Sequence, residues 1–176
     1  MPSETFKSLQ DQAEKMVALN AAVIKIGSCG DIVRDTQRLR AIRDVVPNGP
    51  PLAIDLYWQF HSHHKLLYEA KRWETLGMAW VEDPFAFDDY KSAAELSNSL
   101  SYPVAIGDEQ AGERNFERLM DQGKIGVVRL DATVCGGVKA FLRIAKGASE
   151  RNLPVVCHLF HHIHLQLACV APSVKY

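Results

Sequence analysis

Six ionisable residues recur along the chain at intervals of 23 to 30 residues, each at the end of a short apolar run. They are Lys25, Asp55, Glu82, Asp108, Asp131 and His158. Three successive members are carboxylates, which repel one another at close range unless a cation lies among them. The lysine and the histidine are side chains that can take a proton from a substrate or return it. The series therefore predicts a site that binds one divalent metal and moves a proton.

The successive carboxylates Asp55, Glu82 and Asp108 favour Mg²⁺ as that metal. Hard oxygen ligands suit Mg²⁺, which keeps coordination positions open for water and substrate. Zinc prefers histidine or cysteine, and none of these three runs ends in either. The alternative is three unrelated acids in solvated loops, each at the start of the next helix.

The six apolar runs have the composition of strands that are buried on both faces of a parallel sheet. In order, they are AVIK (22–25), LAID (52–55), AWVE (79–82), VAIGD (104–108), VVRLD (127–131) and PVVCH (154–158). The stretches between them have helical periodicity. In residues 31–46, for example, one side of the helix is apolar and carries Ile32, Leu39, Ile42 and Val46. A proline opens the next run at Pro51, Pro103 and Pro154.

Strands that alternate with helices predict an α/β fold of right-handed βαβ units around a parallel sheet. In a TIM-type (β/α) barrel, the carboxyl ends of the strands bring residues from many parts of the chain to one point. Ionisable residues at the ends of six strands fit that arrangement. An open doubly wound sheet is the alternative, but it normally has a glycine-rich phosphate loop after its first strand. The local candidate, GSCGD at 27–31, lacks the full spacing.

Four motifs carry a resemblance to a known family: VEDP (81–84), GDE (107–109), DATVCGG (131–137) and CHLFHHIH (157–164). Their order resembles the enolase superfamily, and within it the mandelate racemase-like acid-sugar dehydratases and racemases. The resemblance extends from about Phe6 to Tyr176. It implies that VEDP and GDE are metal-binding strand ends, and that the other two motifs carry an aspartate and the histidine that it orients.

The resemblance implies a mechanism for these residues. Mg²⁺ on the three carboxylates would bind the carboxylate of a small-molecule substrate and stabilise the enediolate that forms when the α-proton leaves. Lys25 would be one base, and His158, held by Asp131, the other. A lysine must lose its proton to act as a base, and nearby cationic charge lowers its pKa.

Two segments depart from the pattern of the resembled family. Lys-x-Lys is usual on the second strand, whereas this chain reads Val23-Ile24-Lys25, which keeps only the second lysine. The third strand often reads Asp-x-Asn, but here Tyr57 takes the last position, either to contact substrate or to fill the rim.

Further candidates for substrate binding follow two of the predicted strands. Glu109 directly follows a proposed metal ligand, and His161 follows the proposed base on a helix. We expect His162 and His164, on the same helix, to face solvent.

The chain has 176 residues, whereas a full barrel takes about 250. The resemblance assigns the six strands to the second through seventh of eight. We therefore expect an incomplete barrel with about six of eight βα units, forming a single partial catalytic domain over residues 1–176. The N-terminal capping domain, the first strand and the eighth strand are expected to be absent. A sheet with two unpaired edges favours association, so we expect a homo-oligomer.

Composition excludes several classes of partner. The formal net charge is −1 and basic residues form no block, which argues against nucleic acid and anionic membranes. No apolar run reaches the ~18 residues that a membrane span needs. The four cysteines are scattered without a CxxC pair, which favours reduced thiols and a cytoplasmic location.

The leading hypothesis is a Mg²⁺-dependent acid-sugar dehydratase that abstracts an α-proton and then eliminates water. Dehydration is the commoner outcome of this arrangement of bases in the resembled group. The alternatives are a racemase or epimerase of a 2-hydroxy acid or related carboxylate, and a catalytically inactive barrel fragment.

Overall fold

The computed structural model describes residues 5–175, so the predicted domain limits at residues 1 and 176 lie outside the described residues. It contains six strands: β1 (Ile24–Gly27), β2 (Leu52–Asp55), β3 (Met78–Glu82), β4 (Val104–Ile106), β5 (Val127–Leu130) and β6 (Val155–Cys157). The helices are α1 (Phe6–Ala18), α2 (Ile32–Val45), α3 (His63–Trp73), α4 (Tyr90–Ser99), α5 (Glu113–Asp121), α6 (Val138–Glu150) and α7 (His161–Ala168). A 3₁₀ turn, η1 (Glu74–Leu76), extends α3.

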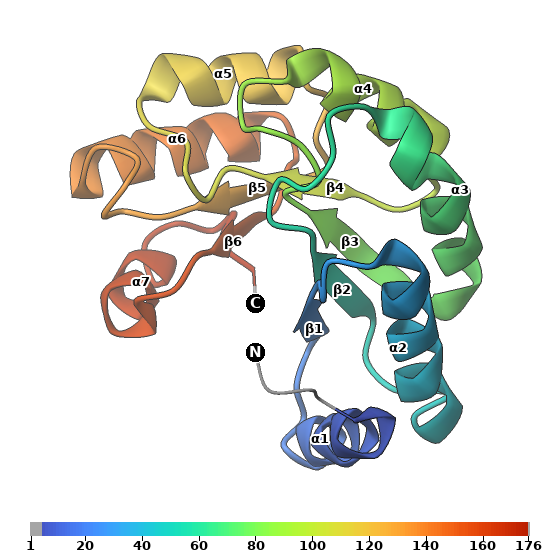
Figure 1. The fold of residues 1–176 in the computed structure, drawn as a ribbon. Coiled ribbons are helices and arrows are strands. Elements are labelled where there is room, and N and C mark those ends of the chain that lie inside the picture. Colours follow the sequence, from blue (N-terminus) through green and yellow to red (C-terminus); the bar gives the residue numbers. More distant parts are fainter. Residues whose placement is uncertain (1–4, 176) are drawn as a thin grey trace.

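The strands form one parallel sheet in the order β1-β2-β3-β4-β5-β6. The sheet curls so that its helices cover the outer side and β1 and β6 face each other across the interior (Figure 1). A doubly wound sheet would reverse its strand order at some point, and this sheet does not. The predicted incomplete TIM-type barrel is therefore confirmed.

Alternation along the strands gives the sheet two faces with different neighbours. One face packs against the helices through large aliphatic side chains, among them Ile54, Ile106, Val128 and Leu130. The inner face carries a second, smaller apolar cluster: Ala53, Trp80, Ala105, Val127 and Val156. On four of the five strands that carry this cluster, the residue two positions further along the chain therefore points into the barrel as well; on β4 that position is Gly107.

Prolines mark the starts of three strands, as the sequence predicted. Each lies directly before its strand, and its carbonyl oxygen accepts a hydrogen bond from the preceding strand. The donors to Pro51, Pro103 and Pro154 are the N–H groups of Ile24, Val81 and Val128, at 3.0, 3.0 and 2.9 Å. A proline lacks a backbone donor but keeps its acceptor, so it can begin a strand without weakening the ladder on that side.

The position of Lys25 within its strand differs from the prediction. The run was expected to end at Lys25, but β1 continues to Gly27, which lies in register with Asp55. Ile24 and Ile26 are both buried in the core, so the strand alternation extends past the lysine. The side chain of Lys25 still reaches the site because it projects from the inner face.

Gly107 connects β4 to Asp108 with a φ of +142° that favours glycine. A Cβ atom there would lie 2.2 Å from the carbonyl oxygen of Arg129 and 3.0 Å from Cε1 of Phe116. We expect Gly107→Ala to lower the free energy of unfolding by about 1–3 kcal/mol through overpacking and to weaken metal binding by moving Asp108. Urea unfolding and Mg²⁺ titration measure the two effects.

Gly30→Ala is the matched control, because Gly30 also has a positive φ but a Cβ there would meet nothing within 4 Å. If both variants lost the same free energy of unfolding, the positive φ of the glycine, and not the clash of a Cβ atom with β5, would explain the destabilisation of Gly107→Ala.

None of the helices in the described part of the chain is both long and apolar enough to cross a bilayer.

Candidate metal and proton-transfer site

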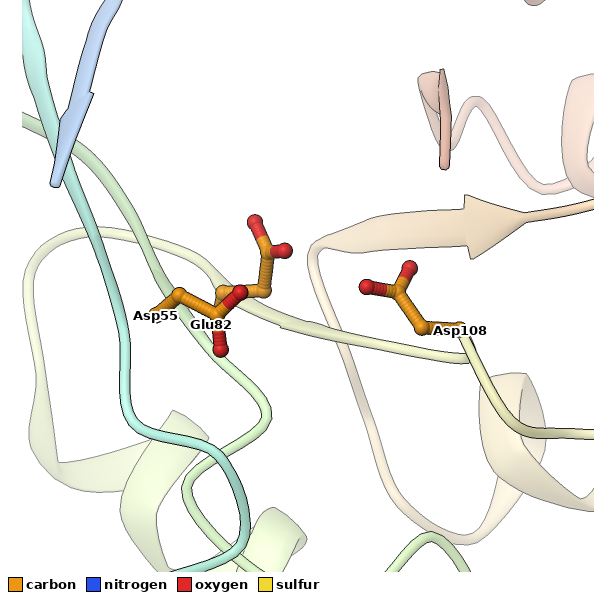
Figure 2. Close-up of side chains that lie close together, drawn as sticks. All are labelled: Asp55, Glu82 and Asp108. Carbon is orange, nitrogen blue, oxygen red and sulfur yellow. The ribbon is translucent and has the colours of Figure 1, made fainter. Parts of the chain in front are cut away.

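Three buried carboxylates meet at the carboxyl ends of adjacent strands. Asp55 ends β2, Glu82 ends β3, and Asp108 lies two residues beyond β4 (Figure 2). One oxygen from each lies within 4.8 Å of the others. Mg²⁺ binds oxygen at about 2.1 Å, so two ligand oxygens on one ion are at most ~4.2 Å apart. Shifts of less than an ångström would bring these oxygens onto one ion, so the donor set fits a hard divalent cation.

Two cationic side chains already contact this carboxylate cluster. Lys25 Nζ lies 3.2 Å from Asp55 Oδ2 and also binds Glu82 Oε1. Arg129 Nε lies 2.9 Å from Asp108 Oδ1 and 3.2 Å from Glu82 Oε1. Three carboxylates against two cations leave an excess of negative charge, which favours a further cation.

The pKa values of the cluster reflect burial and crowding. Burial raises the pKa of Asp108 to about 6, although Arg129 acts in the opposite direction. Burial and the charge of Glu82 raise the pKa of Asp55. Burial also acts to raise the pKa of Glu82, but the charges of Arg129 and Lys25 outweigh burial. The pKa of Glu82 is therefore below its ordinary value. Glu82 is therefore the ionised centre of the cluster.

Asp83 adds a fourth carboxyl group next to the cluster. Burial, then the charges of Asp108, Glu82 and Asp55, raise its pKa well above the usual range. Its Oδ1 is buried and has no hydrogen-bond partner among the described residues. Asp83 therefore crowds the three ligand carboxylates with a further acidic group, one that forms no ion pair in the described part of the chain.

Lys25 is held in its charged form. Burial acts to lower its pKa, but Glu82 and Asp55 outweigh burial and the charge of Arg129, so the net shift is upward. Nearby cationic charge, here that of Arg129, does act to lower the pKa, as expected from the sequence, but the carboxylates contact the lysine more closely and outweigh it.

His158 and Asp131 form a hydrogen-bonded pair in the loops after β6 and β5. His158 Nδ1 lies 3.2 Å from Asp131 Oδ2. The hydroxyl and N–H of Thr133 both donate to Asp131 Oδ1 at 2.7 Å. Burial acts upward on the pKa of Asp131, but the bonds from Thr133 and the two neighbouring histidines hold it below its usual value. Because the ionised carboxylate only accepts, Nδ1 of the neutral imidazole carries the hydrogen, and Nε2, which lies 3.6 Å from Asp108 Oδ2, keeps the lone pair that can take a proton.

A cavity of about 750 Å³ opens on the inner face of the barrel. Lys25, Asp55 and Tyr57 line it from β1 and the end of β2, and Arg129 and His158 line it from β5 and the loop after β6. Trp80, Val23 and Val156 supply apolar surface. The two candidate proton carriers, from β1 and the loop after β6, therefore line the same cavity. β1 and β6 are the two ends of the curled sheet (Figure 1).

The three candidates for substrate binding have different positions. Tyr57 lies at the cavity wall, and its N–H donates to Asp55 Oδ1 at 3.1 Å. Its ring fits over Gly27, where a Cβ would lie 2.1 Å from the phenolic oxygen. Glu109 and His161 are exposed and are not among the residues that line this cavity.

Arg129 is the main site residue that sequence reasoning missed. It is 4% exposed and stands on the inner face of β5, two residues before Asp131. The signal was present in VVRLD: Val128 and Leu130 pack toward the helices, so alternation places Arg129 on the same side as Asp131.

His164 was predicted to face solvent, and this prediction is wrong. It is 2% exposed and stacks on Phe141, with ring centroids 5.7 Å apart. Its Nδ1 bonds the carbonyl oxygen of Leu159 at 2.9 Å, and its Nε2 accepts from the N–H of Ala132 at 3.0 Å. His164 thus ties together the loops that carry Asp131 and His158. Leu159 also has a positive φ of 44°, a conformation that needs such support.

We expect His164→Ala to lower the free energy of unfolding by about 2 kcal/mol, because it leaves the buried N–H of Ala132 without its acceptor and removes the ring that packs on Phe141. Proton transfer through His158 should slow, while the Kd for Mg²⁺ stays unchanged, since the metal ligands lie on other strands. Urea unfolding, substrate turnover and metal titration separate these effects. The exposed His162 gives the control, His162→Ala, which should change none of them.

Comparisons with known proteins agree with this geometry. Residues 8–176 match the family model described as Enolase C-terminal domain-like. The chain is 26% identical over 149 residues to L-talarate/galactarate dehydratase of Salmonella typhimurium, covering 85% of this chain and 37% of that protein. It is 28% identical over 160 residues to arabinonate dehydratase of Saccharolobus solfataricus, covering 86% of this chain and 42% of that protein.

The fold also matches a solved structure, that of a racemase from Streptomyces coelicolor with bound magnesium. The TM-score is 0.91 at 20% identity, over 99% of this chain and 52% of the racemase chain. The present chain thus spans less than half the length of the two dehydratases and about half that of the racemase.

Proposed function

The chain belongs to the Enolase C-terminal domain-like family, and we propose that it forms the catalytic part of a magnesium-dependent dehydratase of a sugar acid. The resemblance to the enolase superfamily that its motifs predicted is thereby confirmed. The observation that carries the proposal is one carboxylate cluster with Lys25 and His158 on either side of a shared cavity. The two curated relatives, both named as dehydratases of sugar acids, support dehydration as the reaction.

Asp55, Glu82 and Asp108 would hold the magnesium ion. When bound, the ion supplies positive charge that stabilises the negative charge developing on the substrate carboxylate as the α-proton leaves. The three acids lie at the ends of adjacent strands and offer hard oxygen ligands, which is the donor chemistry that Mg²⁺ requires.

His158 is placed to act as base and then as acid. Its Nε2 accepts the α-proton, and Asp131 stabilises the imidazolium that results. The imidazolium then gives a proton to the β-hydroxyl, which leaves as water, and the enol product becomes a 2-keto acid. Lys25 meets the substrate from the other side, where its ammonium group can give a proton to the opposite face of the carbon. Tyr57 contacts the substrate at the cavity wall.

Racemisation or epimerisation of a 2-hydroxy acid is the second candidate. The observation that favours it is the presence of two proton carriers at opposite sides of the cavity, since one can remove a proton and the other can return it to the opposite face. The similarity in fold to a racemase agrees with this alternative.

Incubation of the protein with Mg²⁺ and a panel of sugar acids in heavy water tests the proposal. Formation of a 2-keto acid, followed by ¹H NMR, is the expected result. Exchange of the α-hydrogen with inversion but without keto acid would favour the racemase. A protein that binds Mg²⁺ but neither exchanges hydrogen nor forms keto acid with any substrate would contradict both reactions and favour an inactive barrel.

A further inference from the structure

Every oxygen of the three carboxylates already accepts a hydrogen bond or contacts a cation. Arg129 engages both oxygens of Asp108, with Nε 2.9 Å from Oδ1 and Nη2 3.4 Å from Oδ2. Lys25 contacts Asp55 Oδ2 and Glu82 Oε1. The remaining two oxygens accept from the N–H of Tyr57 and from Trp80 Nε1.

Lys25 and Arg129 lie between the cavity and the two most buried metal ligands, Glu82 and Asp108. Glu82 is fully buried and Asp108 is 4% exposed, whereas Lys25, Asp55 and Arg129 line the cavity. An ion that arrives from the cavity therefore meets Asp55 first and reaches Asp108 only where the guanidinium now lies.

We propose that Arg129 sets the affinity of this site for its divalent cation: its guanidinium occupies the carboxylate cluster, and the ion binds by displacing it from Asp108 and Glu82. The inference rests on the metal site of the proposed function and adds the residue that competes for it. The displaced guanidinium keeps an anchor, because its Nη1 also donates to the carbonyl oxygen of Cys157 on β6 at 3.0 Å.

Arg129 is a stronger competitor than Lys25. A guanidinium forms two parallel bonds to one carboxylate and stays charged at any physiological pH. Its stem is fixed by β5 in the buried inner layer, so little conformational freedom is lost when the pair forms. Lys25 binds each of its partners through a single atom, and its side chain is 35% exposed.

The test is the Kd for Mg²⁺, measured by isothermal titration calorimetry on the full chain at fixed pH and salt. Arg129→Gln removes the competing charge, and we expect its Kd to fall at least ~10-fold below that of the unchanged protein. Arg143→Gln is the matched control, because Arg143 also binds a carboxylate, Glu113, through two nitrogens but lies on the surface. It should leave the Kd unchanged. An unchanged or raised Kd in Arg129→Gln would overturn the proposal.

A second measurement does not require Arg129→Gln to fold. The Nε–H of an arginine that donates to buried carboxylates gives a protected ¹H–¹⁵N signal, which Arg129→Lys identifies by its loss. We expect this signal to shift or exchange away in step with added Mg²⁺. A signal that persists unchanged at saturating Mg²⁺ would overturn displacement.

Glu82→Gln distinguishes failure of this inference from failure of the proposed function. If Glu82→Gln loses Mg²⁺ binding but Arg129→Gln does not tighten it, the metal site stands and only the competition is wrong. If Mg²⁺ binds equally well with and without Glu82, the metal site itself is wrong.

Discussion

Replacing Glu82 by glutamine is expected to raise the Kd for Mg²⁺ by more than ~100-fold, the upper range for residues that only support a metal ligand. Glu82 is the central carboxylate: it lies in register with Asp55 on β2, and it shares its Oε1 between Lys25 and Arg129. Glutamine has nearly the same shape but carries no charge, so the cluster would have two carboxylates against two cations. Mg²⁺ titration by calorimetry measures the loss.

The same substitution should leave the fold intact. We expect a loss of about 1–3 kcal/mol in the free energy of unfolding, from weaker hydrogen bonds to Lys25, Arg129 and Trp80. Glu117→Gln, an exposed acid on α5, is the control and should change neither quantity. Full-strength Mg²⁺ binding by a folded Glu82→Gln variant would remove Glu82 from the site.

The fold was predictable because its elements are locally encoded. Each strand is a short apolar run after a helix, and prolines mark the starts of three of them. Strand order followed from the regular spacing, since consecutive βα units place each strand beside the last. The exact end of β1 did not follow, because Lys25 interrupts the apolar run while Ile26 still packs in the core.

The residues of the candidate site that lie at or just after the end of a strand could be predicted from the sequence. Asp55, Glu82 and Asp108 were expected to converge, and the structure brings them within reach of one ion. Arg129 did not follow from the strand ends, because it lies within β5, two residues before Asp131, where strand alternation places it on the inner face. Arg129 bonds both oxygens of Asp108, so the hydrogen bonds of Asp108 did not follow from the sequence.

His164 shows a different limit. Helical position alone does not tell whether a histidine early in α7 points outward or back toward β5. The burial of His164 depends on the tight turn at Leu159 and Phe160, which both have a positive φ. This turn places the first turn of α7 so that His164 reaches the N–H of Ala132. Such a turn uses residues that rarely adopt this conformation, so the sequence carries no local signal for it.

His158→Asn is expected to slow turnover by about 10²–10⁴-fold, the usual contribution of a positioned acid or base, while the Kd for Mg²⁺ stays within a factor of two. Asparagine can still bond Asp131, but it cannot carry a proton between substrate and solvent. Formation of keto acid and exchange of the α-hydrogen, both followed by ¹H NMR in heavy water, measure the effect. His162→Asn, from the exposed start of α7, is the control.

The hydrogen bond from His158 to Asp131 predicts that substitution of Asp131 also slows turnover. Asp131→Asn keeps the size of the side chain, but it replaces an ionised acceptor with a neutral amide that can donate to the imidazole. The tautomer with hydrogen on Nε2 then becomes available, and Nε2 loses the lone pair that faces the cavity. We expect a fall in turnover approaching that of His158→Asn, with no further loss in the double variant, since the two residues act as a unit. Multiplicative losses in the double variant would instead show that Asp131 and His158 act independently.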